Sequence, residues 1–250
     1  MEQYGLIGYP LTHSFSRDFF NRKFSTLHLD AEYLNFELTS ISQLPEVIAQ
    51  HPQLRGLNVT IPYKEQVIPY LHELSDEARA IGAVNVIRVT HTPQGTHLKG
   101  FNSDVTGFSR SIAPLLQPHH RKALVLGTGG ASKAVVYGLH QLRLDTLYVS
   151  RSAVPGRITY DQLDSAMLQE YTVVVNCSPV GMYPHTHERP DLPYNSLDSR
   201  HLLFDLIYNP EETEFLREGR LRGAVTRNGL DMLIGQAHAG WEYWTGTVLP

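Results

Sequence analysis

The stretch LVLGTGGASKAVVYGL, residues 124–139, decides the fold of this chain. It passes from an apolar strand into Gly127, Gly129 and Gly130, and a helix then begins at Ala131. Glycines let the backbone approach a pyrophosphate closely, and the start of a helix offers free N–H groups and the positive end of its dipole. A plain strand-to-helix turn is the alternative. The order of strand, glycines and helix favours a dinucleotide-binding site.

The second strand of this unit, TLYVS at 146–150, is followed by Arg151 and Ser152. Nucleotide-binding folds usually place an acid here that binds the ribose 2′-hydroxyl, and this chain has none. Ser150 and Ser152 can donate hydrogen bonds, while Arg151 can pair with a 2′-phosphate and stack on adenine. The alternative is that Arg151 is a solvated surface residue. The pattern predicts a preference for NADP over NAD.

Strands and helices alternate along the rest of the chain, which is typical of βαβ units. We therefore predict two α/β units, with the boundary in the helical segment 104–117 and a final amphipathic helix at 230–244. In the first unit the pattern predicts strands at 4–8, 32–38 and 54–61, helices after Ser14 or Ser16 and near 41–50, and a hairpin of 83–89 with 96–101. In the second it predicts a strand from 122 into the glycines, a helix at 131–142, and strands at 146–150, 171–176, 202–207 and 223–226.

Composition disfavours several classes of protein. The chain has 250 residues, of which 42% are hydrophobic and 18% charged, as in ordinary globular proteins. Its 25 acidic and 21 basic residues leave a net charge of -4, which disfavours nucleic acid as a partner. No apolar run approaches the roughly 20 residues that cross a bilayer, so we expect no membrane association. The lack of a secretion signal and the single cysteine, Cys177, lead us to expect a cytoplasmic protein.

The histidines do not predict a metal site. Two close pairs, His119 with His120 and His185 with His187, have no further cluster of ligands nearby in the sequence. We expect no metal, and a monomer or a homodimer.

Polar residues gather at the ends of the predicted strands in the first half of the chain. In a βαβ sheet such positions meet at the carboxyl edge, where ligands bind. Any one of them has a simpler explanation as a helix cap, a turn residue or a solvated lysine. Together they predict a ligand site formed by Ser14, Ser16, Asn58, Thr60, Lys64, Asn85, Asn102 and Asp104.

In these motifs the chain resembles the shikimate dehydrogenase family. The likeness spans nearly the whole chain, with the motifs in order and at family spacing. It consists of Ser14-x-Ser16, NVTIPYK (58–64), GAVNV (82–86), GFNSD (100–104), GTGGAS (127–132), DLIYNP (205–210) and NGLDMLIGQA (228–237).

The resemblance implies an NADP-dependent enzyme that reduces 3-dehydroshikimate reversibly to shikimate, in the pathway to chorismate and the aromatic amino acids. It implies a substrate-binding domain at 1–103 plus 230–250 and a Rossmann-like NADP-binding domain at 104–229. The C-terminal helix would return to the first lobe. Two alternatives stay open: a quinate/shikimate dehydrogenase that uses NAD, and a catalytically inactive binding or regulatory homologue.

The resemblance also implies roles for single residues. Ser14 and Ser16 would hold the substrate carboxylate, and Lys64 and Asp104 would form the catalytic pair. The ring hydroxyls would be bound by Thr60, Asn85, Asp104 and Gln236, and Asn58 and Tyr208 would also contact the substrate. The cofactor would contact Gly127, Thr128, Gly129, Gly130, Ala131, Ser150, Arg151, Ser152, Ile207, Gly229 and Met232.

Lys64 suits the chemistry that this family implies. Hydride transfer to a ketone builds negative charge on the carbonyl oxygen, so the site must supply a proton or a positive charge there. An ammonium group can donate the proton during reduction, and a neutral lysine can accept it during oxidation. We expect Lys64 to position and polarise the substrate as well.

The sequence departs from the family pattern at three places. The family commonly has Asn-Arg-Thr with a further basic residue where this chain has Ser-Arg-Ser at 150–152, and Arg157 is the candidate for the missing charge. Val86 replaces a usual threonine. Cys177 and Ser178 replace a more frequent Thr-containing loop.

Overall fold

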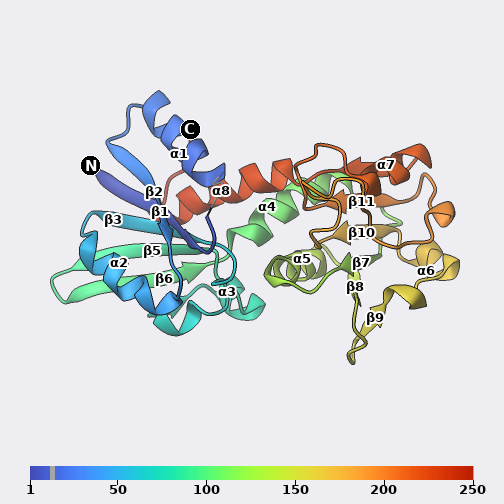
Figure 1. Ribbon diagram of the computed structural model, residues 1–250, viewed down its shortest axis with the longest axis horizontal. Coiled ribbons are helices and arrows are strands. Elements are labelled where there is room, and N and C mark those ends of the chain that lie inside the picture. Colours follow the sequence, from blue (N-terminus) through green and yellow to red (C-terminus); the bar gives the residue numbers. More distant parts are fainter. Residues whose placement is uncertain (12–14, 250) are drawn as a thin grey trace. The chain divides into compact units, whose positions relative to one another are not determined.

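The computed structural model describes residues 1–11 and 15–249, and the chain divides into two compact units (Figure 1). Unit 1 consists of Met1–Ser103 and Ala237–Pro250, and unit 2 consists of Asp104–Gln236. The second boundary lies inside helix α8 (Leu230–Thr245), later than the predicted boundary at 229/230. It lies there because Met232, near the start of α8, packs in a core of unit 2.

Unit 1 is built on a mixed six-stranded sheet in the order β2-β1-β3-β5-β6-β4. Strands β1 (Glu2–Gly8), β2 (Ala31–Glu37) and β3 (Leu54–Val59) are parallel, as expected for strands that helices connect. Strand β5 (Val86–Thr92) is antiparallel to β3 and forms the predicted hairpin with β6 (Gly95–Phe101). The sequence pattern predicted that this strand would begin at residue 83, three residues before its observed start.

The remaining elements of unit 1 connect these strands. They are α1 (Phe15–Thr26), the 3-10 segment Ile41–Gln43, α2 (Leu44–Gln50), the 3-10 segment Ile68–Tyr70, β4 (Glu73–Leu74) and α3 (Asp76–Ile81).

Apolar side chains cover both faces of this sheet. One face packs with α2 and α3 through Leu44 and Ala78, and the other with α1 and α8. The second core is aromatic and holds Tyr4, Phe20, Phe24, Tyr33, Trp241 and Trp244. Position 56 must be glycine, because a Cβ there would lie 2.3 Å from the Trp244 ring. Helix α8 therefore completes the core of unit 1, as predicted for the C-terminal helix.

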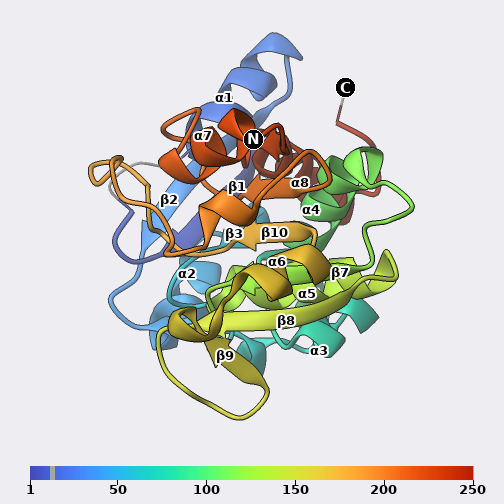
Figure 2. The same cartoon turned by 90° about the vertical axis from the view of Figure 1, so that its right-hand side faces the viewer.

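Unit 2 is built on a parallel six-stranded sheet in the order β12-β11-β10-β7-β8-β9. Figure 2 shows β10, β7, β8 and β9 following one another in this order. Its strands are β7 (Lys122–Leu126), β8 (Asp145–Ser150), β9 (Arg157–Thr159), β10 (Val173–Asn176), β11 (Leu202–Asp205) and β12 (Val225–Arg227).

Helices connect the strands of unit 2, as in a Rossmann-like fold. The predicted helix after the glycines is α5 (Gly130–Gln141). The others are α4 (Ser103–Ile112), α6 (Ser165–Glu170) and α7 (Glu214–Leu221), with 3-10 segments at Ala113–Leu115, Tyr160–Gln162 and Tyr194–Ser196. The strand order reverses at β7, which has β8 on one side and β10 on the other. Ligands of open α/β sheets bind at such a reversal, beyond the carboxyl ends of the strands.

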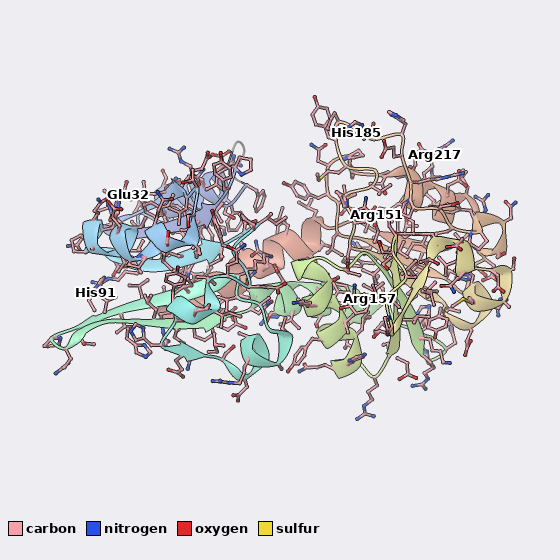
Figure 3. All side chains as sticks on the ribbon, turned by 60° about the horizontal axis from the view of Figure 1, so that its bottom comes forward. Glu32, His91, Arg151, Arg157, His185 and Arg217 are labelled. Atoms are coloured by element: carbon pink, nitrogen blue, oxygen red, sulfur yellow. The ribbon has the colours of Figure 1, made fainter. Side chains whose placement is uncertain are left out.

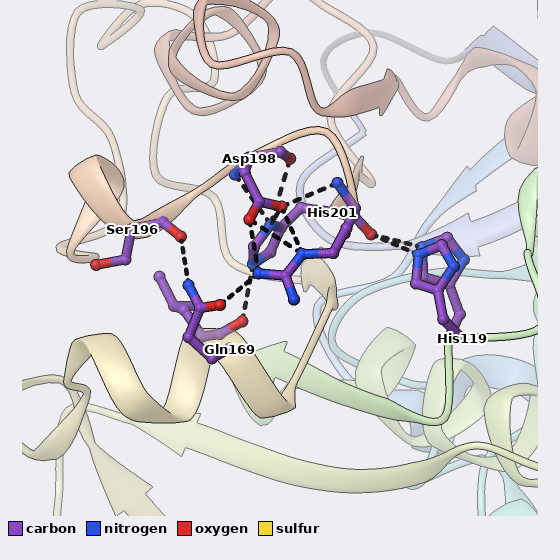
Figure 4. A network of polar contacts seen from close by, with 8 residues as sticks. His119, Gln169, Ser196, Asp198 and His201 are labelled. Carbon is purple, nitrogen blue, oxygen red and sulfur yellow. Dashed lines mark hydrogen bonds and ion pairs between the residues drawn. The ribbon is translucent and has the colours of Figure 1, made fainter.

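Adjacent histidines, His119 and His120, precede β7 and have a structural role. Their Nε2 atoms each lie 2.9 Å from the Arg200 carbonyl oxygen, which fixes the segment before β7 to the segment before β11 (Figure 4). His201 is fully buried next to them and bonds to the Leu168 carbonyl at 2.8 Å.

Among residues 1–11 and 15–249, no group of three or more His, Cys, Asp and Glu side chains is placed to hold a metal ion. No helix in these ranges is long and apolar enough to span a membrane.

Candidate functional site

The strand register of unit 1 brings predicted substrate residues to one edge of the sheet. Asn58, near the end of β3, is opposite Val86 at the start of β5, and Val86 is opposite Phe101 at the end of β6. Because β5 is antiparallel to both neighbours, its first residues lie beside the last residues of β3 and β6. Asn85, which precedes β5, therefore lies at the same edge as Asn58.

Asn85 fixes the start of α4. Its Oδ1 accepts a 2.6 Å hydrogen bond from the Ser103 amide, and its Nδ2 lies 3.0 Å from the Ser103 hydroxyl. Asn85 is 3% exposed and Ser103 is fully buried. Asp104 follows Ser103 in the first turn of α4 and is also buried. The asparagine thus sets the backbone that carries the predicted catalytic carboxylate.

A tyrosine that the sequence did not predict joins two of the predicted residues. Tyr33 Oη donates a 2.6 Å hydrogen bond to Asn58 Oδ1, and the Ser16 side chain also hydrogen-bonds to Tyr33. Burial raises the pKa of Tyr33 well above its usual value, so its hydroxyl stays protonated. A tyrosine in a buried strand needs a partner for its hydroxyl, and that requirement is the signal that could have identified Tyr33.

Lys64 lies in a turn after β3 and not on a helix. Thr60 continues the pairing of the sheet, with its amide 2.9 Å from the Ile7 carbonyl oxygen. The Lys64 carbonyl accepts a 2.7 Å hydrogen bond from the Val84 amide, which is why Val84 does not belong to β5. Lys64 is half-buried.

The glycine segment of unit 2 lies at the reversal of strand order. Gly127 has φ +101°, a conformation that favours glycine, and a Cβ there would lie 3.3 Å from the backbone of Cys177 and Ser178. Gly129 precedes α5 without a side-chain cap, and a Cβ at Gly129 would have no heavy atom within 4 Å. The start of α5 therefore offers backbone N–H groups next to open space, as a phosphate site requires.

The residues predicted to bind the 2′-phosphate of NADP lie at the end of β8 and directly after it. Ser150 Oγ donates a 2.6 Å hydrogen bond to the Ser152 carbonyl, which fixes the turn that carries the exposed Arg151. Arg157, which is labelled in Figure 3, belongs to β9. It pairs in register with Tyr148, and its guanidinium lies 5.6 Å from the centroid of that ring. Arg157 is thus level with the middle of β8, before the carboxyl end where Arg151 follows.

A buried polar network that the sequence did not predict lies beneath this edge of unit 2. Asp205, at the end of β11, accepts hydrogen bonds from Asn176 Nδ2 at 3.1 Å, the Ile207 amide at 3.0 Å and Thr213 Oγ1 at 2.6 Å. Asn176 Oδ1 in turn accepts from the Ser178 amide at 3.0 Å. Burial raises the pKa of Asp205 to about 7, against the lowering effect of its three donors. This network shapes the loops that follow β10 and β11.

The predicted residues after β11 lie beside the start of α8. Gly229 donates from its amide to the Ile207 carbonyl at 3.0 Å, and a Cβ at Gly229 would lie 2.1 Å from the Leu206 carbonyl oxygen. Met232 is buried, whereas Tyr208 is 43% exposed. Gln236 is half-buried at the end of unit 2.

Comparison with known proteins agrees with this arrangement. A family model described as the shikimate dehydrogenase substrate binding domain matches residues 6–87. A protein of Carboxydothermus hydrogenoformans named shikimate dehydrogenase (NADP(+)) is 36% identical, over 98% of this chain and 92% of its own length. The chain belongs to the shikimate dehydrogenase family.

Solved structures of shikimate dehydrogenases share the fold of the whole chain. The Thermus thermophilus enzyme, in complex with NADP(H) and shikimate, is 29% identical with a TM-score of 0.84, covering 99% of this chain and 95% of that chain. The Listeria monocytogenes enzyme, in complex with shikimate and NAD, is 27% identical with a TM-score of 0.85, covering 100% of this chain and 93% of that chain. The predicted α/β fold with two lobes is therefore confirmed.

Within unit 1, the structure links Ser16 and Asn58 through Tyr33, and it links Asn58 to Asn85 because Asn58 Nδ2 lies 3.4 Å from the Asn85 carbonyl oxygen. Ser14 lies outside the described residues. Of the departures from the family pattern, Val86 is fully buried in the aromatic core. Burial raises the pKa of the Cys177 thiol.

Proposed function

We propose that this protein is a shikimate dehydrogenase that reduces 3-dehydroshikimate reversibly to shikimate with NADPH, in the pathway to chorismate and the aromatic amino acids. The observation that carries the proposal is its likeness, over nearly the full chain, to relatives named shikimate dehydrogenase (NADP(+)). A Thermus relative with NADP(H) and shikimate bound shares the fold.

The cofactor site of this proposal lies on unit 2. The open space at Gly129 and the uncapped start of α5 suit a pyrophosphate, and Arg151 suits a 2′-phosphate. When bound, NADPH supplies the hydride of the reaction. The proposed cofactor residues are Gly127, Thr128, Gly129, Gly130, Ala131, Ser150, Arg151, Ser152, Ile207, Gly229 and Met232.

The substrate residues of this proposal lie mainly at the edge of unit 1. Ser16, with Ser14, holds the substrate carboxylate, and the Ser16 hydroxyl turns its single hydrogen from Tyr33 Oη to the carboxylate when the substrate binds. Asn58 and Tyr208 also contact the substrate. The ring hydroxyls are bound by Thr60, Asn85, Asp104 and Gln236.

Lys64 and Asp104 carry the proton chemistry in this proposal. As the substrate carbonyl is reduced, negative charge develops on its oxygen, and the Lys64 ammonium donates a proton there. In the oxidative direction, neutral Lys64 accepts the hydroxyl proton. Asp104 orients the same hydroxyl. Asn85 supports this arrangement through its bonds to Ser103, the residue before Asp104.

One assay tests the function. The purified protein is offered shikimate and quinate, each with NADP and with NAD, while the absorbance of the reduced nicotinamide is followed. We expect the fastest reduction of cofactor with shikimate and NADP. Equal or faster turnover of quinate with NAD would instead indicate the quinate/shikimate alternative. NAD is included in the assay because the Listeria relative was solved with shikimate and NAD bound. No turnover in any of the four mixtures would indicate an inactive homologue.

We also propose that the protein acts in the cytoplasm on small molecules alone, as a monomer or a homodimer. Its biosynthetic reaction and its single cysteine support this proposal. Sedimentation at several protein concentrations measures the oligomeric state.

A further inference from the structure

The hydroxyl of Tyr33 lies between two residues of the proposed substrate site. On one side it donates to Asn58 Oδ1 at 2.6 Å, and on the other the Ser16 side chain hydrogen-bonds to it. Because an amide oxygen only accepts, the single hydrogen of the Tyr33 hydroxyl points at Asn58 Oδ1, which leaves Ser16 as the donor to the Tyr33 oxygen. With Ser16 donating to Oη, the Tyr33 proton is directed at Asn58.

The Tyr33 ring is held in one position. It is 1% exposed and stacks on Phe20 with ring centroids 5.0 Å apart and planes at 11°. Both backbone polar groups of Tyr33 bond to the side chain of Asn21 in α1, at 2.8 and 2.9 Å. The hydroxyl is therefore a fixed donor, and its direction does not depend on a mobile side chain.

The bond to Tyr33 determines which way the Asn58 amide faces. A free asparagine amide can exchange its oxygen and nitrogen by a half-turn. Here Oδ1 is held by Tyr33, and Nδ2 lies 3.4 Å from the Asn85 carbonyl oxygen. The second hydrogen of Nδ2 is then left in a fixed direction for a ligand oxygen. Asn58 is 5% exposed, so its side chain has little room to adjust.

We propose that Tyr33 is a positioning residue for substrate binding: its hydroxyl fixes the Asn58 amide so that Nδ2 faces a substrate oxygen. This inference rests on the proposed function. Tyr33 acts through Asn58 and does not itself touch the substrate.

Tyr33→Phe tests the proposal, because it removes the hydroxyl and keeps the ring. We expect the KM for shikimate to rise about tenfold, the worth of an oriented hydrogen bond, while the KM for NADP stays within twofold. Tyr4→Phe is the matched control. Tyr4 is 1% exposed in the same aromatic core, but its hydroxyl bonds to Glu2 Oε2 at 3.0 Å. Both KM values of the control should stay within twofold of wild type.

A double-mutant cycle separates positioning from general loosening. If Tyr33 acts through Asn58, the Tyr33→Phe/Asn58→Ala protein should have a KM for shikimate within twofold of Asn58→Ala alone. Fully multiplicative effects would overturn the proposal, as would a KM for shikimate in Tyr33→Phe that matches wild type, or an equal rise of both KM values. Should Tyr33→Phe not fold, Asn58→Ala must still raise the KM for shikimate selectively, and failure to do so also overturns it.

Failure of this inference can be told from failure of the proposed function. A wild-type protein that does not oxidise shikimate would remove the proposed function. A wild-type protein that does so, with Tyr33→Phe unchanged, would remove only the role of Tyr33.

Discussion

Thr213 Oγ1 donates a 2.6 Å hydrogen bond to Oδ2 of Asp205 inside unit 2, where neither side chain is exposed to solvent. Thr213 also caps α7, so the bond ties the start of that helix to the end of β11. Burial raises the pKa of Asp205 to about 7, so this carboxyl group changes its protonation state near neutral pH.

Asp205→Asn is expected to change how stability depends on pH. The pKa of Asp205 in the folded protein, about 7, lies above its ordinary value of 3.8. The folded protein therefore holds this proton more tightly than the unfolded protein. The resulting stabilisation is complete below about pH 4 and is lost as the pH rises to about 7, at roughly 1.4 kcal/mol per pH unit. Asparagine cannot ionise, so the variant should not show this loss.

Melting temperatures of both proteins between about pH 5 and pH 8 measure this difference. As the pH rises, the melting temperature of Asp205→Asn should increase relative to that of wild type. Asp161→Asn, at an exposed position, is the control and should follow the wild-type curve. Parallel curves for wild type and Asp205→Asn would contradict the prediction.

Lys64→Ala should lower kcat about 10²–10⁴-fold, the usual worth of a positioned acid or base. The variant should keep its circular dichroism, because Lys64 lies in a turn and the substitution leaves the backbone carbonyl that holds Val84 in place. Lys99→Ala is the control in the same unit, since Lys99 on β6 pairs with Glu73 on β4. A folded Lys64→Ala protein with turnover within tenfold of wild type would remove Lys64 from the mechanism.

Arg151→Ala should raise the KM for NADP about 10–100-fold and leave the KM for NAD nearly unchanged, because only NADP carries the 2′-phosphate. Arg157→Ala should have a much smaller effect, because its guanidinium lies over the Tyr148 ring at the middle of β8. Initial rates with each cofactor at saturating shikimate measure both. Equal losses for NADP and NAD in Arg151→Ala would show that Arg151 does not read the phosphate.

Gly129→Ala and Gly229→Ala should separate binding from packing. A Cβ at 129 meets nothing within 4 Å, so the melting temperature should stay within about 2 °C while the affinity for NADP falls about tenfold or more. A Cβ at 229 would lie 2.1 Å from the Leu206 carbonyl oxygen, so Gly229→Ala should lose about 1–3 kcal/mol of stability. Calorimetric titration with NADP and thermal melts measure the two effects. Unchanged NADP affinity in Gly129→Ala would argue against a phosphate at this loop.

Cys177 should react slowly with thiol reagents in the folded protein. Burial raises the pKa of its thiol, with a further contribution from the Asp205 charge, so little of the reactive thiolate is present near neutral pH. The rate of reaction with a disulfide reagent should rise at least about tenfold on unfolding in urea. Equal rates before and after unfolding would show that the thiol is exposed.

Long apolar runs bounded by glycine or proline predicted most of the fold. The strands at 4–8, 32–38 and 54–61 are confirmed as β1, β2 and β3, and the helix after the glycines is confirmed as α5. The helices α6 and α7 were not predicted, because six and eight residues are too few to show a clear helical period. Strand β9 has three residues, none of them buried, and gives no periodic signal.

Side-chain partners were much harder to predict than strands. Asn176 and Asp205 are 29 positions apart, and Tyr33 and Asn58 are 25 apart. Their bonds depend on which strands are neighbours, and the sheet order of neither unit follows the order of the chain. The motifs identified residues with chemical groups, such as Lys64 and Asn85. Tyr33, which orients Asn58, carries no motif of its own, and the bonds between Asn85 and Ser103 join two separate motifs; both required the register of the strands.

The path of α8 has a consequence for the order in which the chain can fold during synthesis. Trp241 and Trp244 fill the aromatic core of unit 1, whereas residues 104–236 form unit 2 by themselves. On the ribosome, unit 2 has all of its residues before unit 1 has its last core segment. The aromatic core of the first hundred residues, with Tyr4, Phe20 and Phe24, therefore stays incomplete and exposed to solvent until the segment after Ala237 has been synthesised. During this interval the nascent chain most needs protection by a chaperone.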